Sequence, residues 1–224
     1  MNHPNLVNTL DAGHQGELHY FVLEYVEGIP LETAVVRNIL SYGDFLAVIR
    51  QVREALKYIH AEGLPHLDIK TSNIFLNRNG QVKVGDFGLA HLALALGLQG
   101  NSGEIYRAPE LRAGRCSLGP QTDVYSLGMT YHRMFCRSYP ENGQARASVL
   151  NPALPKAVDG VLQEAIAPNP QDRYNSVQTF TVELLSSLMG MAAFFQIDQI
   201  TEESEEPTDA KSAPQAPKGG GSAG

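Results

Sequence analysis

The sequence predicts an α+β fold, in which a short strand-rich start precedes a larger helical body. Three observations support this prediction. Residues 18–26 are strand-like, apolar residues recur at helical spacing between residues 44 and 60, and the stretches after residue 120 have helical character. The chain has 224 residues and is 43% hydrophobic and 18% charged. This composition is typical of a globular chain that buries a core.

The first half of the chain is predicted to contain strands and one long helix. Residues 6–7 and 18–26 are strand-like, and a turn-rich stretch at 11–16 separates them. In residues 44–60 the apolar positions are spaced by 4, 3, 4 and 3, which places them on one face of a helix that Gly63 ends. Residues 74–76 and 81–84 flank the pair Asn79-Gly80, which is a strong signal for a β-hairpin.

The second half is predicted to be helical, with helices at 123–135, 156–167 and 176–191. The last 24 residues, 201–224, differ from the rest. They carry five acidic side chains and then Pro, Ala, Lys and Gly residues, and no aromatic or branched apolar residue follows Ile200. Such a segment cannot bury enough surface to offset the entropy of ordering it, so it is predicted to be a disordered tail or linker.

Charge and cysteine content exclude several classes of protein. Lys and Arg number 17 against 24 Asp and Glu, and a net charge of −7 argues against a general nucleic-acid-binding protein. The two cysteines, Cys116 and Cys136, allow at most one disulfide, which favours a reducing, cytoplasmic setting. No secretory signal is visible at the start. The longest apolar stretch, 184–195, is too short for a membrane span, which needs about 20 residues.

Polar motifs in a fixed order carry the functional signal. The central one is His66-Leu67-Asp68-Ile69-Lys70-Thr71-Ser72-Asn73, and Asp86-Phe87-Gly88 follows it. Others are His3-Pro4-Asn5, the stretch Leu23-Glu24-Tyr25-Val26-Glu27-Gly28, Ala108-Pro109-Glu110, Asp123 and Asp172-Arg173. In this order and spacing they resemble the catalytic core of protein kinases over roughly residues 1–190. A lysine at position 70 resembles the pattern of the Ser/Thr kinases in that family more than that of the Tyr kinases. The sequence is similar to the bacterial Ser/Thr kinases.

The resemblance implies a kinase-like α+β architecture in three parts. Residues 1–28 would be a remnant of the small lobe, a β-hairpin with the hinge. Residues 29–200 would form the mainly helical large lobe, and 201–224 the tail. The implied function is transfer of the ATP γ-phosphate to Ser or Thr of a protein substrate. ATP and Mg²⁺ would be the ligands, and no nucleic acid and no membrane segment of this chain would be involved.

The resemblance also implies roles for the polar residues. Asp68 would accept or orient the proton of the attacking hydroxyl, and Lys70 would meet the transferring phosphoryl group with its charge. Asn73 and Asp86 would supply oxygen ligands to Mg²⁺, a hard cation that proteins hold with few groups. His66 would pack against Phe87 rather than act as a base.

The nucleotide-binding residues follow by the same comparison. Leu23 would be the gatekeeper, and backbone groups of Glu24 and Val26 would face the adenine. Leu31 and Phe75 would pack beneath it. Away from the nucleotide, Glu110 and Arg173 would form a buried ion pair, and Cys136 would serve as a small buried apolar residue.

Three departures from the family pattern stand out. No Gly-rich loop and no lysine strand precede residue 3, so the sequence is either a fragment of a longer kinase or a truncated relative. Leu67 stands where the family has an arginine, and residues 89–103 hold only Ser102 as a phosphate acceptor, so activation by phosphorylation of this segment is not expected. This apolar segment is expected to pack as a short helix against the lobe or a partner. Gly103 replaces a threonine that would bridge the catalytic Asp and Lys.

Two alternatives to an active protein kinase remain open. A pseudokinase or docking module is favoured by Leu67, Gly103 and the missing lysine, whereas the intact Asp68, Lys70, Asn73 and Asp86 favour the enzyme. A small-molecule phosphotransferase shares the same catalytic logic. The Ala108-Pro109-Glu110 motif and Asp123 resemble protein kinases specifically, and they argue against that second alternative.

Overall fold

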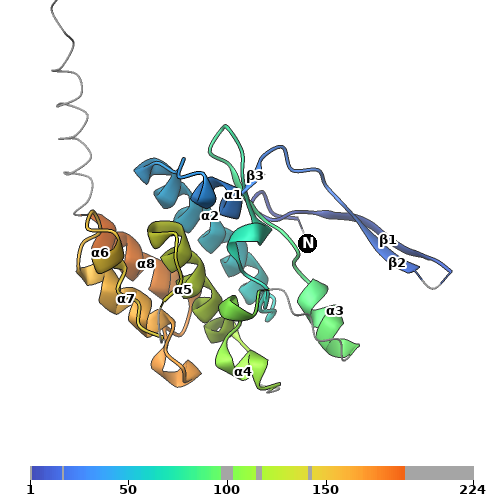
Figure 1. Cartoon of the computed structure of the whole chain (residues 1–224). Helices are drawn as coiled ribbons and strands as arrows, with labels where there is room; N and C mark the ends of the chain where they lie inside the picture. Colours follow the sequence, from blue (N-terminus) through green and yellow to red (C-terminus); the bar gives the residue numbers. More distant parts are fainter. Residues whose placement is uncertain (1, 17, 97–102, 115–117, 141–142, 190–224) are drawn as a thin grey trace, which may run out of the picture.

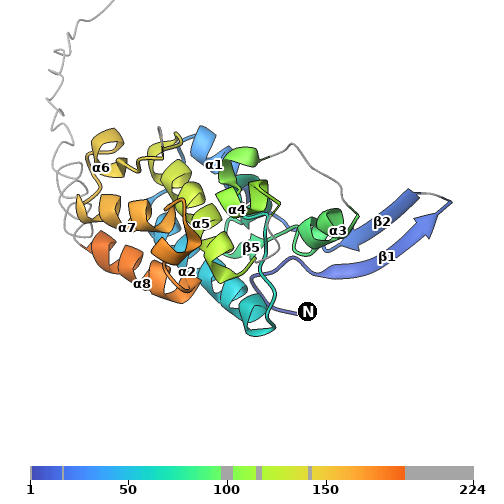
Figure 2. The same cartoon turned by 90° about the horizontal axis from the view of Figure 1, so that it is seen from below.

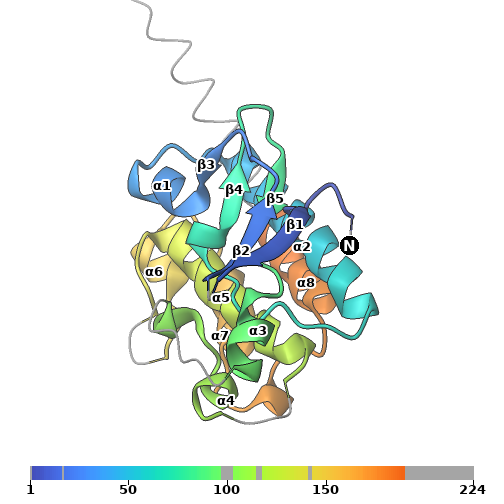
Figure 3. The same cartoon turned by 90° about the vertical axis from the view of Figure 1, so that its right-hand side faces the viewer.

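The computed structural model describes residues 2–16, 18–96, 103–114, 118–140 and 143–189. Most of them form one helical body, from which a two-stranded hairpin projects (Figures 1 and 2). Viewed from the side of the hairpin, the strands lie in front of the helices (Figure 3). The predicted α+β fold class is therefore confirmed.

The projecting hairpin consists of β1 (Thr9–Gln15) and β2 (Leu18–Leu23), which pair antiparallel and form a sheet of their own. Its side chains are nearly all exposed, including Leu18 at 67% and Phe21 at 45%. An isolated two-stranded hairpin is marginally stable in water. The stability of the fold therefore comes from the helical body.

A second sheet lies at the edge of the helical body. Its strands β3 (Ile29–Pro30), β4 (Ile74–Leu76) and β5 (Val82–Val84) are antiparallel in the order β3-β4-β5. The turn between β4 and β5 contains Gly80 at a φ of +72°, a conformation that favours glycine. The hairpin predicted from the Asn79-Gly80 pair is thus confirmed.

The long helix α2 (Tyr42–Ala61) matches the helix predicted at 44–60. Ser41 caps it: its hydroxyl accepts a hydrogen bond from the Asp44 N–H at 3.2 Å, and the Asp44 carboxylate accepts one from the Ser41 N–H at 2.8 Å. The apolar face of α2 is buried in the core, with its fully buried members at Val48, Ile49, Val52, Leu56 and Ile59. The helix therefore forms because it can bury one apolar stripe.

Three further helices complete the body: α5 (Pro120–Cys136), α7 (Ala157–Ala165) and α8 (Val177–Leu188). The helix α5 is buried over most of its length and packs against α7 and α8, while α2 packs against α8. At Gly128 a Cβ would lie 2.7 Å from the Ile166 side chain, so glycine permits the close approach of α5 to the end of α7. The helices predicted at 123–135, 156–167 and 176–191 are confirmed, except that residues 190 and 191 lie outside the described residues.

Short elements connect the main ones and were less predictable. They are α1 (Leu31–Val36), α3 (Leu89–Ala95), α4 (Pro109–Arg112), α6 (Ala147–Leu150) and the 3-10 turns 71–73, 104–106 and 170–172. The short helix expected in the apolar segment is present as α3. Its apolar residues do not pack against the lobe, because no residue of α3 is buried and Leu92 and Leu94 are 41% and 46% exposed, and packing against a partner stays a prediction.

Several sequence predictions concern residues that the structure does not describe. Ser102, Cys116 and the predicted tail at 201–224 lie outside the described residues. Among the described residues, no helix combines the length and the apolar character that crossing a membrane requires. The boundary predicted at residue 28 falls between β2 and β3, where a Cβ on Gly28 would lie 2.7 Å from the Leu76 carbonyl oxygen.

Candidate active site

Three of the predicted site residues lie in one hydrogen-bonded cluster on the loop before β4. The Lys70 Nζ lies 3.1 and 2.9 Å from the two carboxylate oxygens of Asp68. The Asn73 amide Nδ2 donates to the Asp68 Oδ2 at 2.9 Å and to the Asp68 carbonyl oxygen at 3.0 Å. The side chains of Lys70 and Asp68 are only 13% and 21% exposed. The loop therefore presents one fixed carboxylate with a cation beside it.

A buried carboxylate on α5 holds this loop in place. Asp123 is fully buried and accepts hydrogen bonds from the backbone N–H groups of His66, at 2.6 Å, and Leu67, at 2.8 Å. Its Oδ2 also lies 2.7 Å from the His60 Nε2. Leu67 has a φ of +69°, which is unfavourable for a leucine. The two hydrogen bonds to Asp123 stabilise that conformation and so place Asp68.

His66 is a packing and positioning residue, as expected. Its Nε2 lies 3.0 Å from the Gly85 carbonyl oxygen, and its Nδ1 accepts from the Asp68 N–H at 3.3 Å. This pattern fits the neutral ring protonated at Nε2. Its ring centroid is 5.8 Å from that of Phe87. Burial away from water lowers the pKa of His66.

Asp86 lies next to the cluster. The preceding Gly85 donates its N–H to the Asn73 carbonyl oxygen at 2.7 Å, which ties the two segments together. Asp86 itself has a φ of +61°. A cavity of about 110 Å³ separates it from the hairpin, with Asp86 and Phe87 on one side and Phe21 and Leu23 on the other. Among the described residues no side chain hydrogen-bonds to the Asp86 carboxylate.

The donor set of Asn73 and Asp86 fits Mg²⁺. The Asn73 amide nitrogen is bound to Asp68, which leaves the amide oxygen as the ligand atom. Asp86 adds a half-buried carboxylate that no described side chain neutralises. Mg²⁺ is commonly held by one or two such oxygen ligands, with phosphate oxygens and water completing the shell.

Among the residues predicted to face the nucleotide, some keep exposed surface and one is fully buried. Leu23 is 40% exposed and lines the small cavity. Phe75 lies beside Gly85, with its ring edge 3.0 Å from where a Gly85 Cβ would be. Val26 is half-buried on the connection to β3. Leu31, in contrast, is fully buried at the start of α1. Leu31 has no exposed surface on which to contact a ligand. Its expected contact with adenine is therefore not found, and Leu31 supports the site from within the core.

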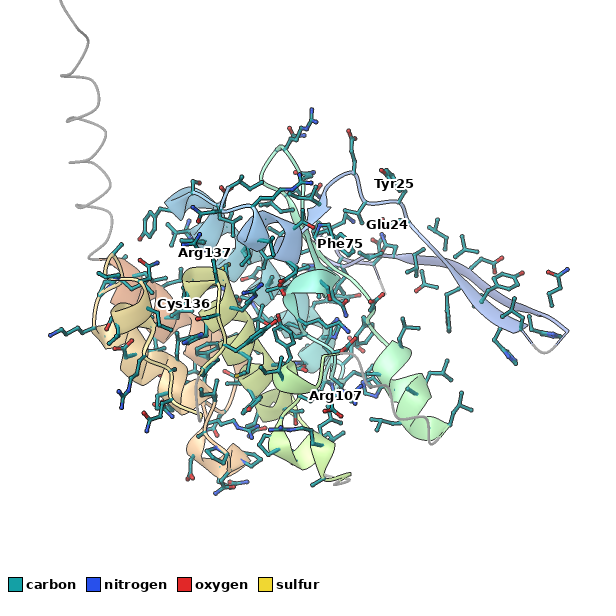
Figure 4. The ribbon with its side chains drawn as sticks, viewed as in Figure 1. Glu24, Tyr25, Phe75, Arg107, Cys136 and Arg137 are labelled. Atoms are coloured by element: carbon teal, nitrogen blue, oxygen red, sulfur yellow. The ribbon has the colours of Figure 1, made fainter. Side chains whose placement is uncertain are left out.

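At Glu24 only one of the two backbone groups is available to face a nucleotide. Its backbone N–H donates to the Asn8 carbonyl oxygen at 2.9 Å, so only its carbonyl is left to face a nucleotide. Its carboxylate forms an ion pair with Lys83 of β5 and accepts from the Asn8 amide at 2.9 Å. These contacts lower the pKa of Glu24 despite its partial burial. Figure 4 shows Glu24 nearer to Phe75 than the outward-lying Tyr25. Sequence reasoning missed this pair, since nothing in the pattern relates positions 24 and 83.

Gly103 lies against Lys70. A Cβ on Gly103 would be 3.2 Å from the Lys70 Cδ, and Gly103 has a φ of +83°. A side chain at this position would be strained and would press on the Lys70 side chain. The bridging hydroxyl that the family places here is therefore absent, and Lys70 binds Asp68 directly instead.

The predicted ion pair of Glu110 and Arg173 is confirmed. Two parallel hydrogen bonds of 2.8 and 2.9 Å join the guanidinium to the carboxylate, and both side chains are at most 3% exposed. Arg173 also donates to the backbone carbonyls of Ala167, Pro168 and Gln121. The pair therefore fixes the segment around α4 against α5.

A second polar network was not predicted. The Thr71 hydroxyl contacts Glu32 and lies 2.7 Å from the Tyr106 hydroxyl. Glu32 in turn pairs with Arg133 of α5. Burial raises the pKa of Tyr106, which keeps its hydroxyl protonated as a hydrogen-bond donor. These residues are scattered over 100 positions, and no sequence pattern links them.

Comparison with known proteins adds independent information. A family model described as the protein kinase domain matches residues 1–191. The Ser/Thr-protein kinase Pkn1 of Myxococcus xanthus is 35% identical over an alignment of 202 residues, and the match covers 80% of this chain and 29% of that protein. PknB of Mycobacterium tuberculosis, also a Ser/Thr-protein kinase, is 30% identical over an alignment of 213 residues, and the match covers 83% of this chain and 33% of PknB. The chain spans about a third of the length of the curated relatives that it matches.

Solved structures of a kinase domain are similar to this chain as well. The crystal structure of the kinase domain of Mycobacterium tuberculosis PknI, determined as a point mutant, matches with a TM-score of 0.69 and 27% sequence identity. The match covers 84% of this chain and 73% of that chain. The kinase-like fold predicted from the sequence is confirmed by this likeness.

Proposed function

Because this chain belongs to the protein kinase family, we propose that it supplies the catalytic machinery for transferring the γ-phosphate of ATP to Ser or Thr hydroxyls of a protein substrate. The observation that carries the proposal is the cluster of Asp68, Lys70 and Asn73, in which one carboxylate is held by a cation and an amide. Such a cluster suits phosphoryl transfer, since this reaction needs positioning and charge stabilisation more than covalent catalysis.

The chemistry follows from the atoms of the cluster. The substrate hydroxyl oxygen forms a bond to the γ-phosphorus, the bond from that phosphorus to the oxygen of ADP breaks, and the hydroxyl proton passes to the Asp68 carboxylate. Lys70 stabilises the negative charge on the transferring group. Asn73 and Asp86 would hold Mg²⁺, which neutralises phosphate charge when bound. Leu23, Phe75, Val26 and the Glu24 carbonyl would form the adenine side of the site.

We also propose that this site is not activated by phosphorylation of the segment at 89–103. Leu67 is 2% exposed and carries no charge, so it cannot receive a phosphate. A phosphate would bring about −1.5 to −2 charges to a segment that contains the exposed apolar helix α3, and Leu67 offers no cation to pair with it.

The test is a chimera in which the small lobe of Myxococcus xanthus Pkn1 is placed before residue 2. With labelled ATP and Mg²⁺ it should transfer phosphate to a protein mixture, and Asp68→Asn should lower the rate by about 10²–10⁴-fold. Ser102→Ala should leave the rate unchanged. Lys57→Met, on the outer face of α2, is the matched control.

The alternative is a pseudokinase that binds nucleotide or a partner without catalysis, and Gly103 is the observation that favours it. If the folded chimera binds ATP and Mg²⁺ but Asp68→Asn changes nothing, the catalytic proposal is wrong and this alternative replaces it. Binding is measured by calorimetry, with Asp86→Asn expected to weaken it only when Mg²⁺ is present.

A further inference from the structure

A cavity of about 720 Å³ lies on the outer side of the connection between β2 and β3. Its walls are this connection, the C-terminal end of α1 and the turn between β4 and β5. We call it the outer groove, and it is lined among others by Tyr25, Arg37, Ile39, Leu40, Leu76 and Arg78. None of these six residues belongs to the catalytic cluster.

The outer groove exposes apolar surface. Tyr25 is 91% exposed and Ile39 is 57% exposed, while Leu40 and Leu76 are half-buried beneath them. Figure 4 shows Tyr25 at the outer edge of the molecule. Contiguous exposed apolar surface bounded by polar residues is characteristic of a binding surface. The groove is therefore suited to a segment that carries apolar side chains.

The rim of the outer groove is positively charged. Arg37 and Arg78 are both exposed, and neither forms an ion pair with any carboxylate of the described residues. Glu27 is the one acidic residue among those that line the groove. Two unpaired arginines around an apolar floor favour an occupant with acidic residues next to apolar ones.

This chain contains such a segment after its last described residue. Phe194, Phe195, Ile197 and Ile200 are followed closely by acids, which are Glu202, Glu203, Glu205, Glu206 and Asp209. The order, apolar first and acidic afterwards, matches a floor with a cationic rim. The segment therefore matches the outer groove in composition and in charge. Its position in the fold is a third argument.

The described chain ends near the start of α2, which follows the groove residue Leu40. The Tyr42 hydroxyl donates to the Leu188 carbonyl oxygen at 2.9 Å, and Tyr42 follows the groove residue Leu40 by two positions. Figure 1 shows the end of α8 on the same side of the molecule as the beginning of α2. From Leu188, an extended chain reaches about 20 Å by Phe194 and about 46 Å by Glu202. An extended chain of this length reaches beyond the start of α2, where Leu40 lies two positions before Tyr42.

We propose that residues 194–209 of this chain dock in the outer groove. The apolar side chains cover Tyr25, Ile39 and Leu40, and the glutamates pair with Arg37 and Arg78. Because the segment is tethered, its effective concentration at the groove is on the order of millimolar, so weak contacts are enough to hold it. The docked segment lies behind the connection that carries Glu24 and Val26, and so it buttresses the nucleotide side of the site from outside.

The experiment is site-specific photo-crosslinking in the full chain, residues 1–224, with Phe195→p-benzoylphenylalanine. Mass spectrometry should find crosslinks within one molecule to peptides that contain residues 25–29, 37–40 or 76–79. The double variant Arg37→Glu with Arg78→Glu should lower their yield by about fivefold or more. The control, Arg146→Glu with Lys156→Glu, makes the same charge change at exposed residues outside the groove and should leave the yield unchanged.

A charge-reversal rescue distinguishes a lost contact from a misfolded variant. Adding Glu202→Arg and Glu203→Arg to the groove variant should restore the yield, and thermal melting should show all variants folded. Crosslinks that map elsewhere on the chain would overturn the proposal, as would equal yields in the groove and control variants. A crosslinked dimer whose yield rises with protein concentration would show that a second copy occupies the groove instead.

Discussion

At the scale of single residues, the loop that carries Asp68 depends on hydrogen bonds to a residue outside it. Leu67 adopts a left-handed conformation that leucine disfavours, with a φ of +69°. The backbone N–H groups of His66 and Leu67 donate charge-assisted hydrogen bonds to the Asp123 carboxylate. These hydrogen bonds offset the free-energy cost of the left-handed conformation of Leu67. The position of Asp68 is therefore determined by a residue 55 positions later in the chain.

Replacing Asp123 should accordingly destabilise the whole fold. In Asp123→Asn the amide has one acceptor oxygen for two backbone donors and lacks the charge. We expect the free energy of unfolding, measured by urea denaturation, to fall by about 1.5–3 kcal/mol. Asp172→Asn changes an exposed carboxylate and is the control. A loss no larger than that of the control would show that the loop holds its conformation without Asp123.

His66 predicts a pH dependence of stability. Burial lowers its pKa in the folded state below the ordinary value of 6.5, which the unfolded chain retains. Between these two pKa values the unfolded chain binds a proton that the folded chain does not. The stabilising contribution is therefore full above pH 6.5 and is lost as the pH falls below it. His66→Gln should lose less stability than wild type between pH 7.5 and 5.5 in urea denaturation, and an equal loss would contradict this assignment.

At the scale of elements, helices with a buried apolar stripe were predictable and short connectors were not. The helix α2 was predicted within two residues at its start because its apolar stripe repeats over about four turns, from Phe45 to Ile59. The helix α1 has six residues and starts after Pro30, which is too short for a period to emerge. For α3 the sequence indicated a helix correctly, but its apolar residues do not show which surface, if any, covers them.

The segment around α4 is joined to the body by one ion pair. Arg173→Met should lower the free energy of unfolding by about 3–5 kcal/mol, because it leaves the buried Glu110 carboxylate without its partner. Arg112→Met changes an exposed arginine of α4, the helix that carries Glu110, and should alter the free energy of unfolding little. Adding Glu110→Gln to Arg173→Met should recover part of the loss, and urea denaturation of the four proteins tests this. Additive losses would contradict the pairing.

The pair of Lys83 and Glu24 should control how firmly the β1–β2 hairpin is attached. Lys83 also donates to the Leu6 carbonyl oxygen at 3.2 Å, so it joins β5, the start of the chain and the end of β2. A charge-assisted hydrogen bond contributes about 1.5–3 kcal/mol. Lys83→Met should therefore speed amide hydrogen exchange in residues 18–23 by roughly tenfold or more, and Glu24→Gln should act similarly. If Lys57→Met has the same effect, the pair does not hold the hairpin.

At the scale of the whole molecule, the candidate site was predictable where it is local in sequence. Asp68, Lys70 and Asn73 lie within six positions on one loop, and a motif identifies them. The contacts that support them join distant positions, as in Glu24 with Lys83 or Thr71 with Tyr106, and only the folded chain brings these together. The fully buried state of Leu31 likewise depends on packing among α1, β4 and α5, which no linear pattern records.

The described hairpin predicts how residues 1–224 behave alone. The hairpin has exposed apolar side chains on both strands, and among these 224 residues there is no Gly-rich loop and no lysine before Lys57 to bind the α- and β-phosphates. Loss of one preorganised charge contact typically costs about 10²–10³-fold in rate. We therefore expect ATP turnover by residues 1–224 to be at least that much slower than in the chimera with a complete small lobe, although Mg²⁺-dependent binding at Asn73 and Asp86 should persist. Turnover by residues 1–224 that matches the chimera and disappears in Asp86→Ala would show that the hairpin alone is enough to cover the nucleotide.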